Sequence, residues 1–200
     1  MQNFMDKTIG FFGDSFCASR RSDSWCVILA DGLGLDITHW GTGGASIWNT
    51  MMQFNSMETK PDVMVFCWTE TTRLFHRRLP LTPNAVPIPG EDPKVFEASS
   101  MYYKYLQDDD KDFLAGRYAL QWFDQKELKQ YEKDHKIVQA WSFRTEGVAL
   151  HTGKIIDQEM VKFAWGGETP GSDYKNDLDM SNHMTSQRNQ EWAELVRAVL

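Results

Sequence analysis

Residues 8–15 of the chain read TIGFFGDS. The run from Thr8 to Phe12 is β-branched and aromatic, which is typical of a buried strand. Gly13 and Asp14 favour a tight turn, so we expect the strand to end there. Ser15 follows directly. The segment therefore predicts a first strand with a serine hydroxyl exposed just beyond its carboxyl end.

Strand and helix patterns alternate after this turn. Apolar residues at helical spacing predict helices at 22–33 and 46–57. The first of these has Ser22 or Asp23 available as its N-cap and Gly34 as its stop. Residues 36–40 and 62–68 predict two more strands, and the second (DVMVFCW) is apolar almost throughout, as in a strand covered on both faces. The alternation predicts a parallel sheet with helices on both sides.

The remainder of the chain is less regular. Five of the seven prolines fall in residues 79–94, which we expect to be an extended loop. Further helices are predicted at 95–106, 112–134 and 187–200, the last capped by Thr185 or Ser186, and further strands at 136–143 and 159–165. The whole chain, residues 1–200, is thus predicted to be one α/β domain, a three-layer α/β/α sandwich with a parallel five-stranded sheet. Residues 72–134 form an inserted loop and helical excursion of unassigned role.

Composition and charge exclude several classes of protein. The formal net charge of -7 argues against nucleic-acid binding, which needs clustered Lys and Arg, and the short basic stretches 20–21 and 73–78 are expected in solvated loops. No apolar run reaches the ~18 residues of a membrane helix, and residues 1–6 lack the features of a signal peptide. Three cysteines without metal-ligand spacing indicate a reduced compartment and no metal site. We therefore expect a cytoplasmic protein without nucleic-acid or membrane partners.

Three features fall where the predicted strands end, the edge at which open α/β sheets bind ligands. They are Ser15, the glycine-rich turn 41–44, and Thr69-Glu70-Thr71. His183 comes late in the chain, with Asp177 and Asp179 just before it. Each feature alone is explained by a turn, a cap or a surface residue. Their conjunction is what a serine hydrolase requires.

The same stretches resemble the sequence blocks of the SGNH (GDSL-like) hydrolases. The matching stretches are Phe12–Phe16 (FGDSF), Trp40–Ser46 (WGTGGAS) and Asp179–His183 (DMSNH). The resemblance implies a flavodoxin-like fold of SGNH type and ester hydrolysis through an acyl-enzyme, without metal or organic cofactor. It implies Ser15 as nucleophile, His183 as general base, Asp179 as the acid with Asp177 in reserve, and the N–H groups of Ser15 and Gly41 as oxyanion donors.

Two departures from the family pattern stand out. Glu70 lies where the third block usually supplies an asparagine as oxyanion donor, and an ionised carboxylate cannot donate. Thr69 or Thr71 then donates instead, or Glu70 is turned away or protonated, or turnover is weak. The family acid also normally lies three residues before the histidine, where this chain has Met180 and not Asp179.

The natural substrate is less well indicated than the reaction. Trp40, Trp68, Trp141 and Trp165 fall near the ends of predicted strands, so they are candidates to line a substrate cleft, although core packing explains each of them as well. Carbohydrate deacetylases are common in the resembled family. That analogy points to a small or carbohydrate ester and to O-deacetylation.

Three other interpretations compete with this one. The altered third block, and a likeness to hydrolase-like proteins of bacterial viruses, suit a non-catalytic binding module or a virion structural protein that keeps the fold. A flavodoxin-like nucleotide binder is disfavoured, because the turn before Ser15 has a single glycine and no phosphate loop. Cys17 is a rival nucleophile, but it lies inside the predicted turn. Self-association and association with a virus particle stay open.

Overall fold

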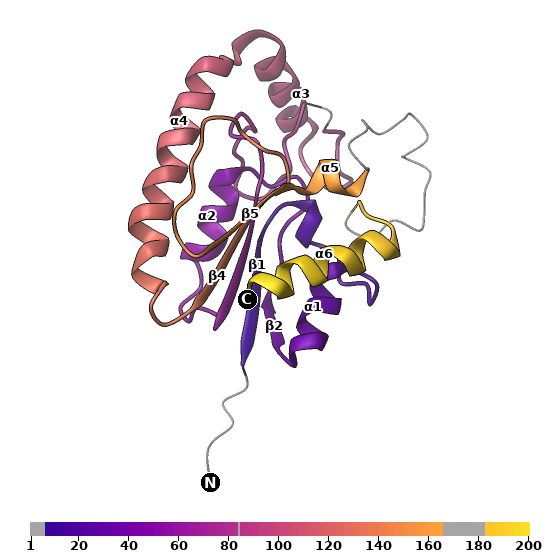
Figure 1. Cartoon of the computed structure of the whole chain (residues 1–200). Helices are drawn as coiled ribbons and strands as arrows, with labels where there is room; N and C mark the ends of the chain where they lie inside the picture. The colour runs from indigo at the N-terminus through magenta and orange to yellow at the C-terminus, as the bar shows by residue number, and fades with distance from the viewer. Residues whose placement is uncertain (1–6, 84, 166–182) are drawn as a thin grey trace.

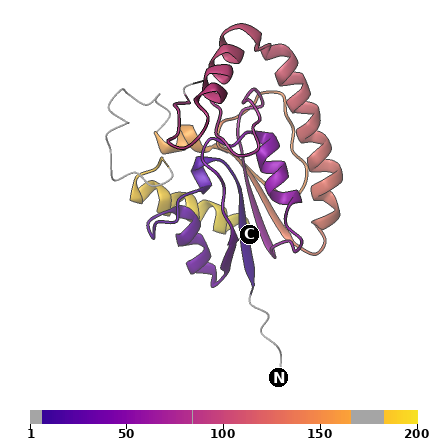
Figure 2. The ribbon, with the colours of Figure 1, turned by 180° about the vertical axis from the view of Figure 1, so that it is seen from behind.

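The computed structural model of the chain describes residues 7–83, 85–165 and 183–200. Its centre is one parallel sheet of five strands in the spatial order β2-β1-β3-β4-β5. The strands are β1 (Thr8–Gly13), β2 (Asp36–His39), β3 (Val63–Trp68), β4 (Lys136–Trp141) and β5 (Lys154–Glu159). Helices cover both faces, as Figures 1 and 2 show, so the predicted three-layer α/β/α sandwich is confirmed.

Alternate side chains of the inner strands supply two separate cores. Phe11 and Val65 belong to the core under α1 (Trp25–Leu33) and α6 (Ser186–Val199). Their neighbours Phe12 and Phe66 belong to the core under α2 (Ile47–Asn55) and the helical excursion. This two-residue alternation is why β1 and β3 are buried along their length, since each face of these strands needs apolar cover.

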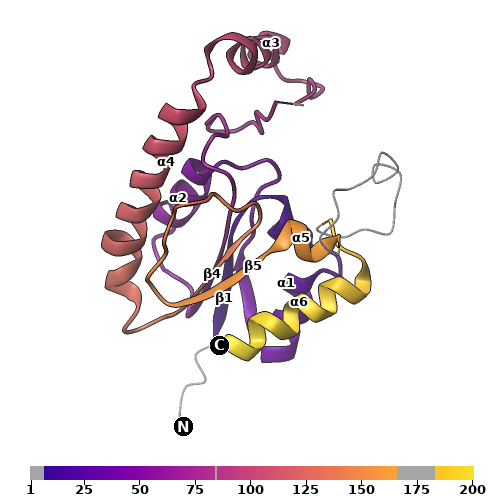
Figure 3. The same cartoon turned by 45° about the horizontal axis from the view of Figure 1, so that its top comes forward.

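The excursion between β3 and β4 contains α3 (Pro93–Met101) and α4 (Asp109–Trp122). Asp92 caps α3 and Asp108 caps α4, each accepting a backbone N–H. Helix α4 continues through a π-helical turn, Phe123–Leu128, and runs along one side of the sheet. Figure 3 shows α3 beyond the end of the sheet at which the strands finish. Within the described ranges, no helix combines the length and apolar character needed to cross a membrane.

Two local predictions were wrong. Helix α1 begins at Trp25 with Ser24 in the N-cap position, not Ser22 or Asp23, although Gly34 does end it with a φ of 64°. The segment 159–165 is not a strand: β5 ends at Glu159, and Met160–Ala164 form helix α5. Met160 and Ala164 are both buried at a spacing of four, which suits a helix, whereas β5 is an edge strand with only Ile156 buried.

A buried polar network fastens the excursion to the sheet. Asp124 is fully buried, and its carboxylate accepts hydrogen bonds from the Gln139 amide (2.6 Å) and from the backbone N–H groups of His151 (2.8 Å) and Thr152 (3.0 Å). Gln139 in turn accepts from the indole N–H of Trp68 at 2.8 Å. The network spans the excursion, the ends of β3 and β4, and the loop before β5.

This network yields a stability prediction. Asp124→Ala leaves three buried donors without their acceptor, and each costs about 1–3 kcal/mol. We expect the free energy of unfolding, measured by urea denaturation, to fall by roughly 3 kcal/mol or more. Asp157→Ala is the control, because that side chain is 84% exposed and should change stability by less than about 0.5 kcal/mol. Equal effects of the two substitutions would contradict the prediction.

Candidate active site

Ser15 lies on a tight turn at the carboxyl end of β1. It opens a short 3-10 helix, Ser15–Cys17, that Asp14 caps by accepting the N–H of Phe16 at 3.1 Å. The turn needs Gly13, because a Cβ there would lie 2.4 Å from the carbonyl oxygen of Cys67. Ser15 itself is half-buried, and its N–H donates to no group in the described part of the chain. Ser15, which the sequence predicts as the nucleophile, therefore lies on a tight turn and has a backbone N–H without a partner in the described residues.

His183 lies beside this turn. Its ring centroid is 5.1 Å from that of Phe16, the residue after Ser15. His183 also has a φ of 62°, the single positive value at a non-glycine among the described residues, and such backbone strain clusters at functional sites. The structure thus brings the first strand's serine and the late histidine to the same end of the sheet. Asp179 and Asp177 lie outside the described residues.

Arg73, which follows β3, joins these groups. Its Nε donates to Glu70 at 2.7 Å, and its Nη1 lies 3.4 Å from both an Asp14 carboxylate oxygen and the carbonyl oxygen of Ala45. The guanidinium also sits 4.8 Å from the ring centroid of Phe143. Its side chain is only 9% exposed. The expectation that the basic stretch 73–78 lies wholly in a solvated loop is therefore wrong at Arg73.

The ion pair explains how the site tolerates Glu70. One carboxylate oxygen of Glu70 accepts from Arg73, and the other accepts the hydroxyl of Thr69 at 2.8 Å. Both oxygens are thus engaged, and the Thr69 hydroxyl is directed at Glu70. Thr71 is buried against Gly116 of α4, and a Cβ added to Gly116 would lie only 2.4 Å from the Cβ of Thr71. The Thr69 hydroxyl is therefore engaged, whereas the buried Thr71 hydroxyl makes no hydrogen bond within the described residues, so donation by Thr71 stays a prediction.

The glycine turn after β2 has a different division of roles from the one expected. The Gly41 N–H donates to the carbonyl of Cys17 at 3.1 Å, so it is not a free oxyanion donor. Gly41 is instead a close-packing position, since a Cβ there would lie 2.8 Å from the carbonyl oxygen of Asp14. Two N–H groups of the turn, those of Gly43 and Gly44, make no hydrogen bond within the described residues. Gly44 has a φ of 70°, which favours glycine.

Two titratable groups of the site have shifted pKa values. Burial raises the pKa of Asp14 above its usual range, and the positive charge of Arg73 and hydrogen bonds from Phe16 and Ser142 oppose that shift. Burial lowers the pKa of His183, and the nearby Arg73 charge lowers it further. A neutral imidazole is therefore the favoured form, as a general base requires.

Cys17 does not suit the role of rival nucleophile. It is fully buried, and burial raises the pKa of its thiol well above the ordinary value. The reactive thiolate is therefore disfavoured. Cys26 and Cys67 are buried free thiols of the same kind.

Two of the four tryptophans, Trp68 and Trp141, lie in the core and do not line a cleft. Trp68 is fully buried, with its ring stacked 5.3 Å from that of Phe66, and Trp141 is 2% exposed. Trp40 and Trp165 are half-buried and pack against the core beneath α1 and α6. Side chains near strand ends alternate between the two faces, and here helices cover both faces. Core packing is thus the role of Trp68 and Trp141.

Comparison with known proteins gives a likeness of fold. The sequence matches no protein-family model and no curated protein. Similar solved structures include one described as a G-D-S-L family lipolytic protein from Desulfitobacterium hafniense DCB-2, with 10% identity, a TM-score of 0.48, and coverage of 97% of this chain and 99% of that one. Another is a family two carbohydrate esterase from Clostridium thermocellum in complex with cellohexaose, with 12% identity and a TM-score of 0.46. In that case 96% of this chain spans 63% of the longer one.

Proposed function

We propose that the protein is a serine esterase of SGNH type that hydrolyses a small or carbohydrate ester. The observation that carries the proposal is the meeting of His183 with the Ser15 turn at the carboxyl end of β1. Ser15 is half-buried on this turn, and the imidazole that contacts the turn at Phe16 has a lowered pKa, which supports nucleophilic catalysis with His183 as base.

The mechanism follows from serine chemistry. The Ser15 hydroxyl attacks the ester carbonyl carbon while His183 takes its proton, and the tetrahedral intermediate then expels the alcohol, which receives that proton. Water attacks the acyl-enzyme with His183 again as base, releasing the acid and restoring Ser15. In this proposal Asp179 orients the imidazole and stabilises its charged form, with Asp177 as the alternative.

We assign the oxyanion site to three sources of positive potential. The N–H of Ser15 and those of Gly43 and Gly44 are without partners in the described part of the chain. The third source is Arg73, whose Nε and Nη1 are engaged and whose Nη2 makes no hydrogen bond within the described ranges. In this proposal Arg73 supplies the donor that the family takes from an asparagine, and Glu70 serves to hold Arg73 in place.

A non-catalytic binding module is the second candidate, and Glu70 is the feature that favours it. That residue removes the family's amide donor from the third block. Its pairing with Arg73 weakens this argument, because the carboxylate is bound at both oxygens.

The two candidates differ in the reactivity of Ser15. We expect a fluorophosphonate probe to label the folded protein at Ser15, and Ser15→Ala to reduce hydrolysis of p-nitrophenyl acetate by about 10³-fold or more. Ser22→Ala is the control, since Ser22 is exposed in the loop before α1 and should leave both readouts unchanged. An unlabelled Ser15 in folded protein would remove catalysis and leave the binding module.

Arg73→Lys tests the assigned oxyanion donor. Lysine keeps the charge but loses the planar fork that contacts Glu70, Asp14 and Ala45 together. We expect kcat to fall about 10²–10³-fold with little change in KM, since the lost contact acts in the transition state. Circular dichroism verifies the fold, and Arg144→Lys at an exposed pair serves as control. A folded variant with kcat within about threefold of the wild type refutes this role.

The pH dependence of kcat/KM tests the assigned base. Protonation of His183 abolishes its basicity, and burial and Arg73 both disfavour that protonation. Activity should therefore persist as the pH falls through the ordinary histidine value of 6.5 and be lost only below it. Arg73→Gln removes one of the two causes, so it should move this acidic limb to higher pH. A wild-type limb at or above 6.5 would contradict the assignment.

A further inference from the structure

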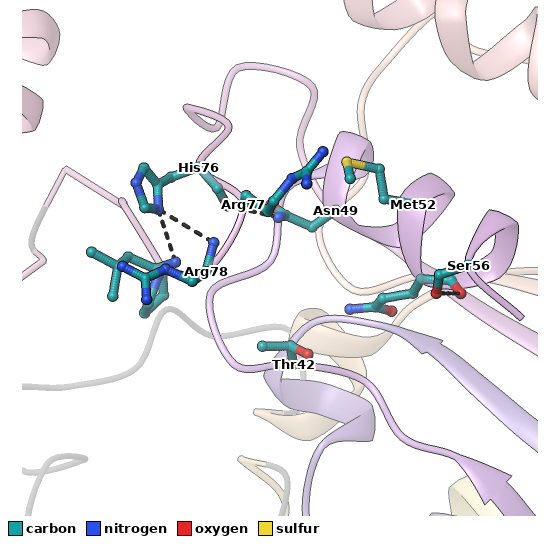
Figure 4. Close-up of a pocket in the computed structure, with 10 residues that line it drawn as sticks. Thr42, Asn49, Met52, Ser56, His76, Arg77 and Arg78 are labelled. Atoms are coloured by element: carbon teal, nitrogen blue, oxygen red, sulfur yellow. Dashed lines mark hydrogen bonds between the residues drawn. The ribbon is translucent and has the colours of Figure 1, made fainter.

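A pocket of about 230 Å³ adjoins the proposed site (Figure 4). It lies between α2 and the loop that follows Arg73. Seven of its ten lining residues are polar or basic, although apolar atoms also contribute to its wall: Thr42, Asn49, Met52, Gln53, Ser56, His76, Arg77, Arg78, Leu79 and Pro80.

The pocket wall is held in place by hydrogen bonds. The Asn49 amide on α2 donates to the carbonyl of His76 at 2.9 Å, which anchors the loop to the helix. The Nδ1 of His76 accepts the N–H groups of Arg78 (3.3 Å) and Leu79 (3.0 Å), contacts drawn in Figure 4. The loop is therefore folded to present its two arginines at the pocket.

The charge of the pocket is positive. In the part of the chain that the structure describes, no acidic side chain lines it. Arg77 is exposed and forms no ion pair within the described residues, and Arg78 is 74% exposed with only a 3.7 Å contact to Glu91. The chain as a whole carries a net charge of -7, so two arginines beside neutral hydrogen-bonding groups are a local exception. Such a combination suits an anionic oxygen group, which arginine binds through paired N–H donors.

The pocket shares residues with the turns of the proposed site. The N–H of Thr42 donates to the carbonyl of Gly13 at 2.9 Å, and the Gln53 side chain contacts the N–H and the carbonyl of Gly13 at 3.0 and 3.3 Å. On the other side, Pro80 packs against Gly44, where a Cβ would lie 2.3 Å from that of Pro80. The wall of the pocket therefore contacts the turn that carries Ser15 through Gly13, and the glycine turn through Gly44.

We propose that this pocket binds an anionic group on the substrate, so that the preferred ester carries a carboxylate or phosphate. This inference rests on the proposed esterase function, because the anion is part of a substrate only if the protein is an esterase. The affinity of the pocket for an anion does not depend on catalysis. Arg77 and Arg78 supply the charge, and Asn49 and Thr42 are neutral groups that line the same space.

Direct binding tests the pocket without turnover. Isothermal titration of the full chain would compare methyl glucuronide, glucose 6-phosphate and neutral methyl glucoside. We expect at least one anionic sugar to bind roughly tenfold or more tightly than the glucoside, as paired charge-assisted hydrogen bonds provide. The stronger of the two identifies the group as carboxylate or phosphate. No preference for either anionic sugar overturns the proposal.

Substitution locates the effect. In the double variant Arg77→Gln/Arg78→Gln, we expect the affinity for the anionic sugar to fall about tenfold relative to that for the glucoside. Arg197→Gln on α6, across the sheet, should leave this ratio unchanged. An unchanged preference in the folded double variant also overturns the proposal. If binding behaves as expected but the fluorophosphonate leaves Ser15 unlabelled, the anion pocket stands and the esterase proposal fails. If Ser15 is labelled and no anion is preferred, the esterase proposal stands and the anion pocket fails.

Discussion

The buried ion cluster around Arg73 is the constraint on which the site depends. Its guanidinium is held by Glu70 at the end of β3 and by Asp14 at the end of β1, and Asp14 has no exposed surface. A buried carboxylate without a partner is costly, so each group needs the others in place. Ser142 adds a hydrogen bond to Asp14 from beyond β4 at 2.8 Å. Three strand ends are thus locked together beneath the serine turn.

The sheet order explains why those three strand ends meet. β1 lies between β2 and β3, so the chain first continues to β2 on one side of β1 and then crosses to β3 on the other side. Where the strand order reverses in this way, a crevice forms at the carboxyl ends of the strands. The turn carrying Ser15, the glycine turn after β2 and the Arg73 loop all open into this region. The helical excursion is fastened to the sheet separately, because Asp124 at its end accepts a hydrogen bond from Gln139 of β4. Two polar networks therefore stabilise the fold and the site, one through Asp124 and Gln139 and the other through Arg73, Asp14 and Glu70.

The sequence predicted the features that arise from local periodicity. Four of the five strands and the main helices follow from apolar spacing, whereas the edge strand β5 and its adjoining helix were misplaced. Long-range pairing was beyond that reasoning. Arg73 and Asp14 are 59 residues apart, and the stretch RLFHRR reads as a charged loop until its partners are known. The same holds for Gly41, whose N–H is engaged by a carbonyl 24 positions earlier, at Cys17. A carboxylate at position 70 with an arginine three residues later was the available signal for an ion pair.

Charge balance decides whether such a cluster suits an oxyanion. With both carboxylates ionised, Arg73, Asp14 and Glu70 together carry one net negative charge, which opposes a developing oxyanion. Burial raises the pKa of Asp14, and a proton there would make the cluster neutral. Burial lowers the pKa of His183, and the positive charge of Arg73 lowers it further, so this guanidinium acts on the imidazole as well as on the two carboxylates. In the proposed reaction, the Nη2 group of Arg73, which makes no hydrogen bond within the described residues, donates to the oxyanion that forms on the substrate.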